Sequence, residues 1–237
     1  MNFFDSAIIS FVNGYAQKSF LFDHFMDRLS AIQLLKGGVF VAIIWGVWFQ
    51  RGSEAIVRRN RTIVLSTIVG TLIALACTRL LSMTMPFNVR PFANANIIFK
   101  IPLSFSGEVA DWSSFPSNHA ALFASLAAGL YLFSRRMLWF VIPYLIIVIF
   151  LPRIFLGLHY PTEILAGTIL GIVSVLLTHK WFMAASIPDK ILDWANEHPG
   201  MFYSFFFIMT YQIADLFYDC RNLAYFFRKL IHHLAGF

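Results

Sequence analysis

Residues 115–163 begin with F-P-S-N-H-A and end with P-R-I-F-L-G-L-H-Y-P-T-E, the second run starting at Pro152. The segment between the two runs is almost purely apolar and is interrupted only by Ser134-Arg135-Arg136. Two histidines, one arginine and one carboxylate therefore lie at the ends of hydrophobic helices. Titratable groups at such depth are costly, and in membrane proteins they tend to be functional. The stretch predicts a membrane helix bundle with a chemical site inside it.

The composition of the chain favours the same class of protein. The chain has 237 residues, 59% of them hydrophobic and 13% charged, whereas soluble proteins are about 45–50% apolar and about 25% charged. We attribute the formal net charge of +6 to basic cytoplasmic loops and to attraction to anionic lipid headgroups, so no nucleic-acid partner is expected. The two cysteines, Cys77 and Cys220, give neither a disulfide framework nor metal-ligand spacing.

Long apolar segments predict the membrane spans. A hydrocarbon core about 30 Å thick needs roughly 20 helical residues. Five segments qualify, namely 33–50, 62–82, 118–134, 137–157 and 161–179. A sixth segment, 201–218, is aromatic but carries Gln212 and Asp215, so it is either a span or an interfacial helix. We favour the span.

The N-terminal segment is expected to lie at the membrane surface. Apolar side chains recur at helical spacing over residues 3–20, and they are Phe4, Ile8, Phe11 and Tyr15. The run is too short and too polar to cross a bilayer, which favours an interfacial amphipathic helix. We therefore expect an all-α, polytopic membrane helix bundle of five to six transmembrane helices plus this N-terminal helix. It would form a single membrane-embedded domain over residues 1–237.

Basic residues are distributed unevenly among the expected loops. The 51–61 loop carries four arginines, and the 134–137 turn carries two. Cytoplasmic loops are enriched in Lys and Arg, so both are expected on the cytoplasmic side. The 83–117 loop and the 152–160 turn then share the opposite, extracytoplasmic face, together with both histidine motifs.

The first histidine motif is Pro116-Ser117-Asn118-His119. Pro and Ser just before an apolar run are signals for the start of a helix. Ser117 can cap this helix, and the free N–H groups of the first turn form an anion site. His119 lies in that first turn and would face the bound anion. Taken alone, the motif fits an ordinary capped helix with an interfacial histidine equally well.

The second histidine motif runs from Arg153 to Glu163. Gly157 permits close backbone approach, and Pro161 suits the first position of a helix. His159 and Glu163 are spaced i, i+4, so they can share one helix face. A carboxylate that binds one ring nitrogen fixes the tautomer and leaves the other nitrogen free as a nucleophile. The alternative is a structural Arg–Glu pair beside an interfacial histidine.

Arg90-Pro91 is a third motif, in the loop before the first one. Arginine binds phosphate in a bidentate manner, although a lone loop arginine is more often simply solvated. Together, and in this order, the three motifs resemble the type 2 phosphatidic acid phosphatase family, the membrane branch related to vanadium haloperoxidases and bacterial acid phosphatases. The family pattern is Lys-x6-Arg-Pro, then Pro-Ser-Gly-His, then Ser-Arg-x5-His-x3-Asp. The resemblance covers residues 62–180.

The chain departs from this pattern at four positions. The family lysine corresponds to Met83, which removes one phosphate-neutralising charge. Arg79, one helical turn earlier, and Lys100 are the candidate substitutes. The other departures are Asn118 in place of glycine, Glu163 in place of aspartate and Pro152 in place of serine.

The resemblance implies a division of roles among the motif residues. His159 would attack phosphorus and form a phosphohistidine, Glu163 would orient it, and His119 would protonate the leaving oxygen and later activate water. The phosphoryl oxygens would be held by Arg90, Arg153, Ser117 and the N–H of Asn118. No metal and no other cofactor is implied, and the sequence shows no carboxylate cluster suited to a metal.

The resemblance therefore predicts a multi-pass lipid phosphatase of the inner (cytoplasmic) membrane, with its active site facing the periplasm or exterior. Its substrate would be a polyprenyl diphosphate or a phospholipid phosphate that enters laterally from the bilayer. A Pro-Ser-x-His motif with a polar residue at x is similar to that of the undecaprenyl-diphosphate phosphatase branch. Two alternatives are a lipid phosphotransferase and a catalytically inactive membrane scaffold, the latter suggested by Met83, Asn118 and Glu163.

Overall fold

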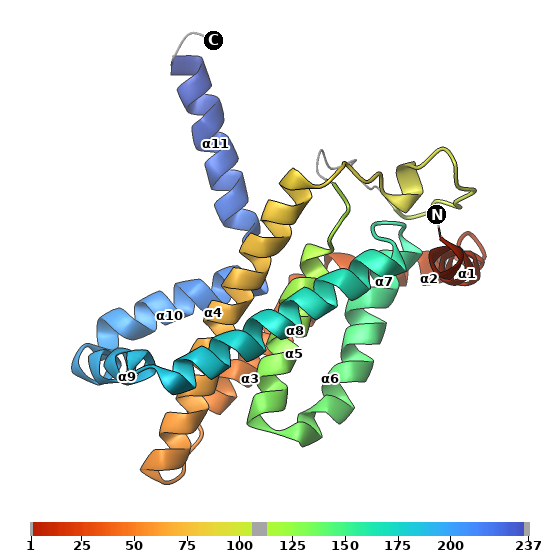
Figure 1. Cartoon of the computed structure of the whole chain (residues 1–237). Helices are drawn as coiled ribbons and strands as arrows, with labels where there is room; N and C mark the ends of the chain where they lie inside the picture. Colours follow the sequence, from red (N-terminus) through yellow and green to blue (C-terminus); the bar gives the residue numbers. More distant parts are fainter. Residues whose placement is uncertain (1, 106–112, 235–237) are drawn as a thin grey trace.

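All regular structure in the described residues, 2–105 and 113–234, is helical in the computed structural model (Figure 1). No strand occurs in these residues, so the expected all-α fold is confirmed. The elements in chain order are α1 (Phe3–Asn13), α2 (Phe20–Ala31), η1 (Leu34–Gly38), α3 (Val39–Trp48), α4 (Glu54–Thr84), η2 (Pro91–Ala93), α5 (Asn118–Phe133), η3 (Arg135–Met137), α6 (Leu138–Tyr144), η4 (Leu145–Phe150), α7 (Leu151–Phe155), α8 (Pro161–Ala184), α9 (Ile187–Glu197), α10 (Pro199–Ala214) and α11 (Tyr218–Leu234).

Three helices, α4, α5 and α8, pack against one another at the centre of the bundle (Figure 1). Small residues bring their backbones together: a Cβ atom at Gly167 of α8 would lie 2.4 Å from the carbonyl oxygen of Ser117. A hydrogen bond of 2.8 Å joins the hydroxyl groups of Thr71 on α4 and Ser125 on α5. Packing through small and hydroxyl residues is typical of membrane helices. It fixes the start of α5 against the start of α8, where the two histidine motifs lie.

Three helical segments are long and apolar enough to cross a membrane, Glu54–Thr84, Arg135–Phe155 and Pro161–Ala184. A fourth is counted if Phe20–Ala31 and Leu34–Trp48, which are bent by 62° relative to each other, act as one span. The expected spans at α5 and α10 have 16 residues each, which is about 24 Å of helix against a core about 30 Å thick. The described residues thus give three or up to four spans, and the expected five to six are not confirmed.

The N-terminal helix is present, but it is shorter than expected. α1 ends at Asn13 rather than near residue 20, and the chain turns at Gln17, whose φ is +64°. Phe4 and Phe11 are exposed on one face of the helix, as expected for a helix at a membrane surface. The other face is buried against α7 and α8.

Polar side chains on the buried face of α1 tie it to the segments that carry the histidine motifs. Asp5 accepts hydrogen bonds from the backbone N–H and the hydroxyl of Thr162, at 2.9 and 2.8 Å. Asn13 exchanges two hydrogen bonds of 2.8 Å with the backbone of Lys100. α1 therefore holds both the start of α8 and part of the loop that precedes α5.

The C-terminal helices pack on another side of the bundle. α10 lies against α3, where the Trp48 ring stacks on Phe202 with 5.3 Å between centroids, and its Nε1 donates to the hydroxyl of Tyr203 at 3.1 Å. α11 projects away from the other helices (Figure 1). The aromatic contact fixes α3, and with it the preceding turn η1, against α10.

Candidate active site

The turn between α7 and α8 carries a buried histidine–carboxylate pair. His159 Nδ1 lies 3.1 Å from Glu163 Oε2 and 3.0 Å from the carbonyl oxygen of Ser114. Both neighbours are acceptors, so Nδ1 carries the ring hydrogen and Nε2 is left unprotonated. The i, i+4 spacing brings the two side chains together, as the sequence predicts, and only 6% of His159 and 1% of Glu163 are exposed.

Two residues that the sequence motifs do not include complete the environment of Glu163. Its Oε1 accepts hydrogen bonds from Asn88 Nδ2 at 2.6 Å and from Ser114 Oγ at 2.5 Å. Its Oε2 also accepts from the backbone N–H of Tyr160 at 3.1 Å. A carboxylate held by this many donors has a fixed orientation, and it fixes the ring of His159 in turn. The only sequence signal for Asn88 and Ser114 is their closeness to Arg90 and to the Pro-Ser-Asn-His motif.

Gly157 allows the loop before α5 to close over this turn. Its φ is +66°, and a Cβ atom there would lie 2.9 Å from the backbone nitrogen of Phe92. That nitrogen donates to the carbonyl oxygen of Gly157 at 3.1 Å, and Arg90 Nη1 donates to the carbonyl oxygen of Leu158 at 2.9 Å. The expected close backbone approach at Gly157 is confirmed.

Arg90 reaches this turn with part of its guanidinium group unused. In the described part of the chain, its Nε is buried and has no hydrogen-bond partner. Burial lowers the pKa of Arg90, and the nearby charge of Glu163 opposes that effect. A buried donor without an acceptor costs about 1–3 kcal/mol, and an anionic ligand would remove that cost.

The start of α5 lies directly beside the pair. Ser117 caps the helix, since its Oγ accepts from the N–H of Ala120 at 3.4 Å, and its own N–H donates to the carbonyl oxygen of Glu163 at 3.2 Å. Among the described residues, Asn118 Oδ1 is buried without a hydrogen-bond partner. A helix N-terminus favours an anion, and this one lies beside the histidine–carboxylate pair.

Arg153 contacts His119, the histidine of the Pro-Ser-Asn-His motif. Its Nη2 lies 2.6 Å from His119 Nε2 and 3.2 Å from the carbonyl oxygen of Ser30 on α2. Arginine only donates hydrogen bonds, so His119 Nε2 is the acceptor and carries no hydrogen in this arrangement. Arg153 is also close enough to Arg90 and His159 for their charges to interact, so both histidines, Glu163 and the two arginines lie in one region.

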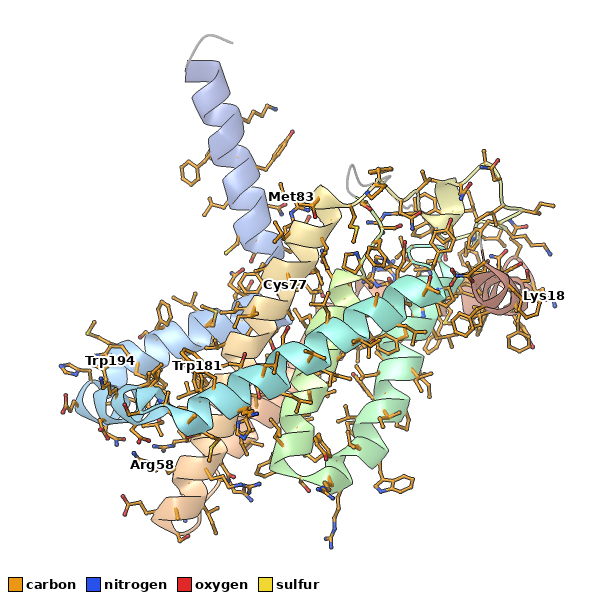
Figure 2. All side chains as sticks on the ribbon, viewed as in Figure 1. Lys18, Arg58, Cys77, Met83, Trp181 and Trp194 are labelled. Carbon is orange, nitrogen blue, oxygen red and sulfur yellow. The ribbon has the colours of Figure 1, made fainter. Side chains whose placement is uncertain are left out.

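Met83, at the position of the family lysine, and its two candidate substitutes, Arg79 and Lys100, lie in different environments. Met83 is 69% exposed near the end of α4 (Figure 2). Lys100 is exposed, and it contacts Asn13 through its backbone rather than its side chain. Arg79 is half-buried on α4, one turn before Met83. The structure therefore does not support Lys100 as a substitute.

Within residues 2–105 and 113–234, no group of three or more His, Cys, Asp or Glu side chains is arranged to hold a metal ion. The histidines that the structure places in the site are bound to Glu163 and Arg153 instead. Metal-independence remains a prediction.

The fold and these residues define a helical membrane protein with a buried histidine–carboxylate pair beside two arginines. Residues 63–187, just over half of the chain, match the PAP2 superfamily, and the match includes all three motifs. The protein belongs to this superfamily, whose members are phosphatases. The matched region closely follows the range of the sequence resemblance, 62–180.

A curated relative is similar over part of the chain. The bacitracin transport permease protein BcrC of Bacillus licheniformis is 29% identical over 120 residues. The alignment covers 50% of this chain and 55% of that protein, so the chain matches about half the length of this relative. No solved structure matches the chain.

Proposed function

We propose that this protein hydrolyses a membrane lipid phosphate, either a polyprenyl diphosphate or a phospholipid phosphate, through a phosphohistidine on His159. The observation that carries the proposal is the bifurcated contact of His159 Nδ1 with Glu163 and the Ser114 carbonyl. This contact leaves Nε2 as an unprotonated nucleophile. Burial, as the largest influence, lowers the pKa of His159, and Glu163 raises it in part, so the ring is neutral near pH 7.

In the first step, His159 Nε2 forms a bond to phosphorus while the bond from phosphorus to the leaving oxygen breaks. The electron pair of that bond goes to the leaving oxygen, which His119 protonates. Glu163 stabilises the positive charge that develops on His159, because its carboxylate lies 3.1 Å from Nδ1. The carboxylate does not need to move, since four other contacts already hold the pair in place.

The oxygens of the phosphoryl group need positive charge and hydrogen-bond donors in the transition state. Arg90 Nε, the N-terminus of α5 and Arg153 supply them. The buried Nε of Arg90, which has no partner in the described residues, supports this role because a phosphoryl oxygen provides the acceptor it lacks.

In the second step, a water oxygen attacks the phosphorus of the phosphohistidine, and His119 accepts the proton of that water. The electron pair of the phosphorus–nitrogen bond returns to His159 Nε2, and inorganic phosphate leaves. No metal is needed for either step, because the histidine is the nucleophile and the arginines neutralise the charge.

The distribution of charge supports an extracytoplasmic site. Residues 51–61, most of which form the first turns of α4, and the 134–137 turn carry six arginines between them. They lie at the end of the bundle opposite the starts of α5 and α8 (Figure 1). By the positive-inside rule, the arginine-rich end faces the cytoplasm of a bacterial inner membrane. A lipid substrate would reach the histidines laterally from the bilayer.

The test is release of inorganic phosphate from a polyprenyl diphosphate and from phosphatidic acid by the purified full-length protein in EDTA. Wild-type protein should release phosphate from at least one substrate, and His159→Ala from neither. Transfer to an added lipid hydroxyl in place of water would identify a phosphotransferase. A folded wild-type protein that releases phosphate from neither substrate would identify an inactive scaffold.

A further inference from the structure

Lys36, which lies outside the three sequence motifs, is buried inside the bundle. It belongs to η1, between α2 and α3, and only 2% of it is exposed. Its Nζ donates a hydrogen bond of 2.5 Å to the carbonyl oxygen of Ser30. A lysine buried at the 62° bend between Phe20–Ala31 and Leu34–Trp48 is costly, and in membrane proteins such a group is a functional-site hypothesis by default.

The oxygen that Lys36 contacts is shared with the active site. Arg153 Nη2 donates to the same Ser30 carbonyl at 3.2 Å, and the same Nη2 lies 2.6 Å from His119 Nε2. Two cations that bind one oxygen lie within a few ångströms of each other. Lys36 is therefore connected to His119 through one carbonyl group and one guanidinium group.

This pair of cations has no close carboxylate to neutralise it. In the described part of the chain, the carboxylate ion pairs are Arg58–Asp189 and His159–Glu163, and neither includes Lys36 or Arg153. Asp215, at the end of α10, acts on Lys36 only from beyond ion-pair distance. Two close positive charges in a low dielectric repel each other, and a bound anion relieves that repulsion.

The packing around η1 fixes Lys36 in this place. The residue that follows it, Gly37, is pressed against α10 so closely that a Cβ atom there would lie 2.2 Å from the carbonyl oxygen of Ala214. This contact leaves η1 little room to rotate. The Lys36 side chain is thereby directed to the interior, toward α2 and Arg153.

We propose that Lys36 is a positioning residue of the phosphate site, an inference that rests on the phosphoryl-binding role proposed for Arg153. When an anion draws Arg153 away from Ser30 and His119, the Ser30 carbonyl keeps a donor, because Lys36 stays bound to it. The movement of Arg153 then leaves no buried carbonyl unsatisfied. A nearby anion favours the protonated form of Lys36, whose charge then adds to the potential that attracts the phosphate, and this contribution grows with the charge of the anion.

The experiment measures equilibrium binding of inorganic phosphate and of pyrophosphate to the purified full-length protein by calorimetry. Lys36→Met should weaken phosphate binding about tenfold or more, the effect expected for a hydrogen-bonded charge. It should weaken pyrophosphate binding by a larger factor, and Lys36→Arg should restore most of both. Arg58→Met is the matched control, because it removes the same charge from an exposed side chain near the start of α4 that is paired with Asp189 and not with Ser30 (Figure 2).

Lys36→Gln separates the charge from the hydrogen bond and serves if Lys36→Met does not fold. The glutamine amide can still donate a hydrogen bond to the Ser30 carbonyl, so this variant should fold. Without the charge, it should bind pyrophosphate more weakly than Lys36→Arg does. Wild-type affinity for both anions in folded Lys36→Gln, or an equal loss in Arg58→Met, would overturn the proposal. Binding is measured without turnover, so the two proposals can fail separately. If the Lys36 variants bind both anions more weakly, as expected, but the wild-type protein releases no phosphate, only the proposed phosphatase activity is contradicted.

Discussion

Arg153 Nη2 lies 2.6 Å from His119 Nε2, and this contact occupies the lone pair that His119 would use in catalysis. An arginine cannot accept a proton in return, so His119 is held neutral at Nε2 while the contact lasts. A phosphoryl oxygen is a stronger acceptor for a guanidinium group than an imidazole nitrogen. Binding of substrate would therefore transfer Arg153 to the phosphate, and it would leave His119 Nε2 open to take up from solvent the proton that it then donates to the leaving oxygen.

This coupling predicts the effect of Arg153→Lys. A lysine keeps the charge but loses the planar pair of donors that can contact Ser30, His119 and a phosphate in turn. We expect kcat/KM for phosphate release to fall about 10²–10³-fold, the loss typical of one donor to a developing anion. Arg58→Lys, at the exposed Arg58–Asp189 pair, should leave kcat/KM unchanged. Near-wild-type activity of Arg153→Lys would remove Arg153 from the phosphate site.

The buried environment of His159 predicts the acid limb of the pH profile. Burial lowers its pKa below the usual value of 6.5. The nucleophile must be neutral, so activity is retained as the pH falls through 6.5 and is lost only below the lowered pKa. In Glu163→Gln the limb should move further toward acid, because the charge and hydrogen bond of Glu163 raise the pKa of His159. The measurement is kcat/KM against pH for both proteins.

An acid limb centred above pH 6.5 in the wild-type protein would show that His159 is not the titrating nucleophile. A limb that moves toward neutral pH in Glu163→Gln would contradict the orientation proposed for the pair. The overall rate of Glu163→Gln should also fall, since the amide presents the ring of His159 with a weaker acceptor.

The contact between Asn88 and Glu163 gives a prediction with a close control. Asn88→Ala removes a 2.6 Å hydrogen bond to the carboxylate that orients His159, so kcat should fall about 10–100-fold, as for other partners of a functional ligand. Asn94 lies in the same loop and donates to the hydroxyl of Tyr160 instead. Asn94→Ala should therefore keep most of kcat. Equal kcat losses in both variants would point to general disruption of the loop.

The sequence could predict the local parts of this site. His159 and Glu163 meet because they are one helical turn apart, and Ser117 caps α5 because its hydroxyl reaches an N–H three residues later. Gly157 was recognisable because few other residues adopt a positive φ. In each case the partner lies within a few residues or the constraint is in the backbone, so a short motif contains the information.

The remaining parts depend on contacts between distant segments. Asn88 reaches Glu163 across 75 residues, and the Ser30 carbonyl reaches Arg153 across 123, so neither pairing leaves a spacing pattern in the sequence. The end of α1 was also missed, because the turn there uses Gln17 in a conformation more common for glycine. The number of spans is not confirmed, because apolar composition does not determine where a helix ends, and α5 and α10 have only 16 residues each.

The arrangement of the loops predicts a definite topology. Residues 83–117, of which 106–112 lie outside the described residues, should be outside the cytoplasm and residues 51–61 inside it. Ile98 is 99% exposed in the first loop, and Ser53 is exposed in the second. On a background without the two native cysteines, Ile98→Cys should react with an impermeant thiol reagent in intact cells, and Ser53→Cys should react only after lysis. The reverse pattern would invert the orientation of the site.

The two histidines should differ in how strongly each depends on the leaving group. His159 forms the covalent bond, so His159→Ala should be inactive on every phosphoryl substrate. His119 matters in the first step only as far as the leaving oxygen needs a proton. Phosphatidic acid expels an alkoxide, whose departure general acid catalysis speeds by about 10²–10⁴-fold. A polyprenyl diphosphate expels a phosphate monoester, which leaves with little protonation.

His119→Ala should therefore lose more of its phosphorylation rate on phosphatidic acid than on the diphosphate. It should also accumulate phosphohistidine from the diphosphate, because the group that activates the incoming water is missing. Rapid-quench labelling of purified His119→Ala, with both substrates labelled at the transferred phosphorus, measures both effects. Equal rate losses on the two substrates would refute the role of His119 as the acid, since protonation would not depend on the leaving group. Covalent label that persists in His159→Ala would identify a different nucleophile.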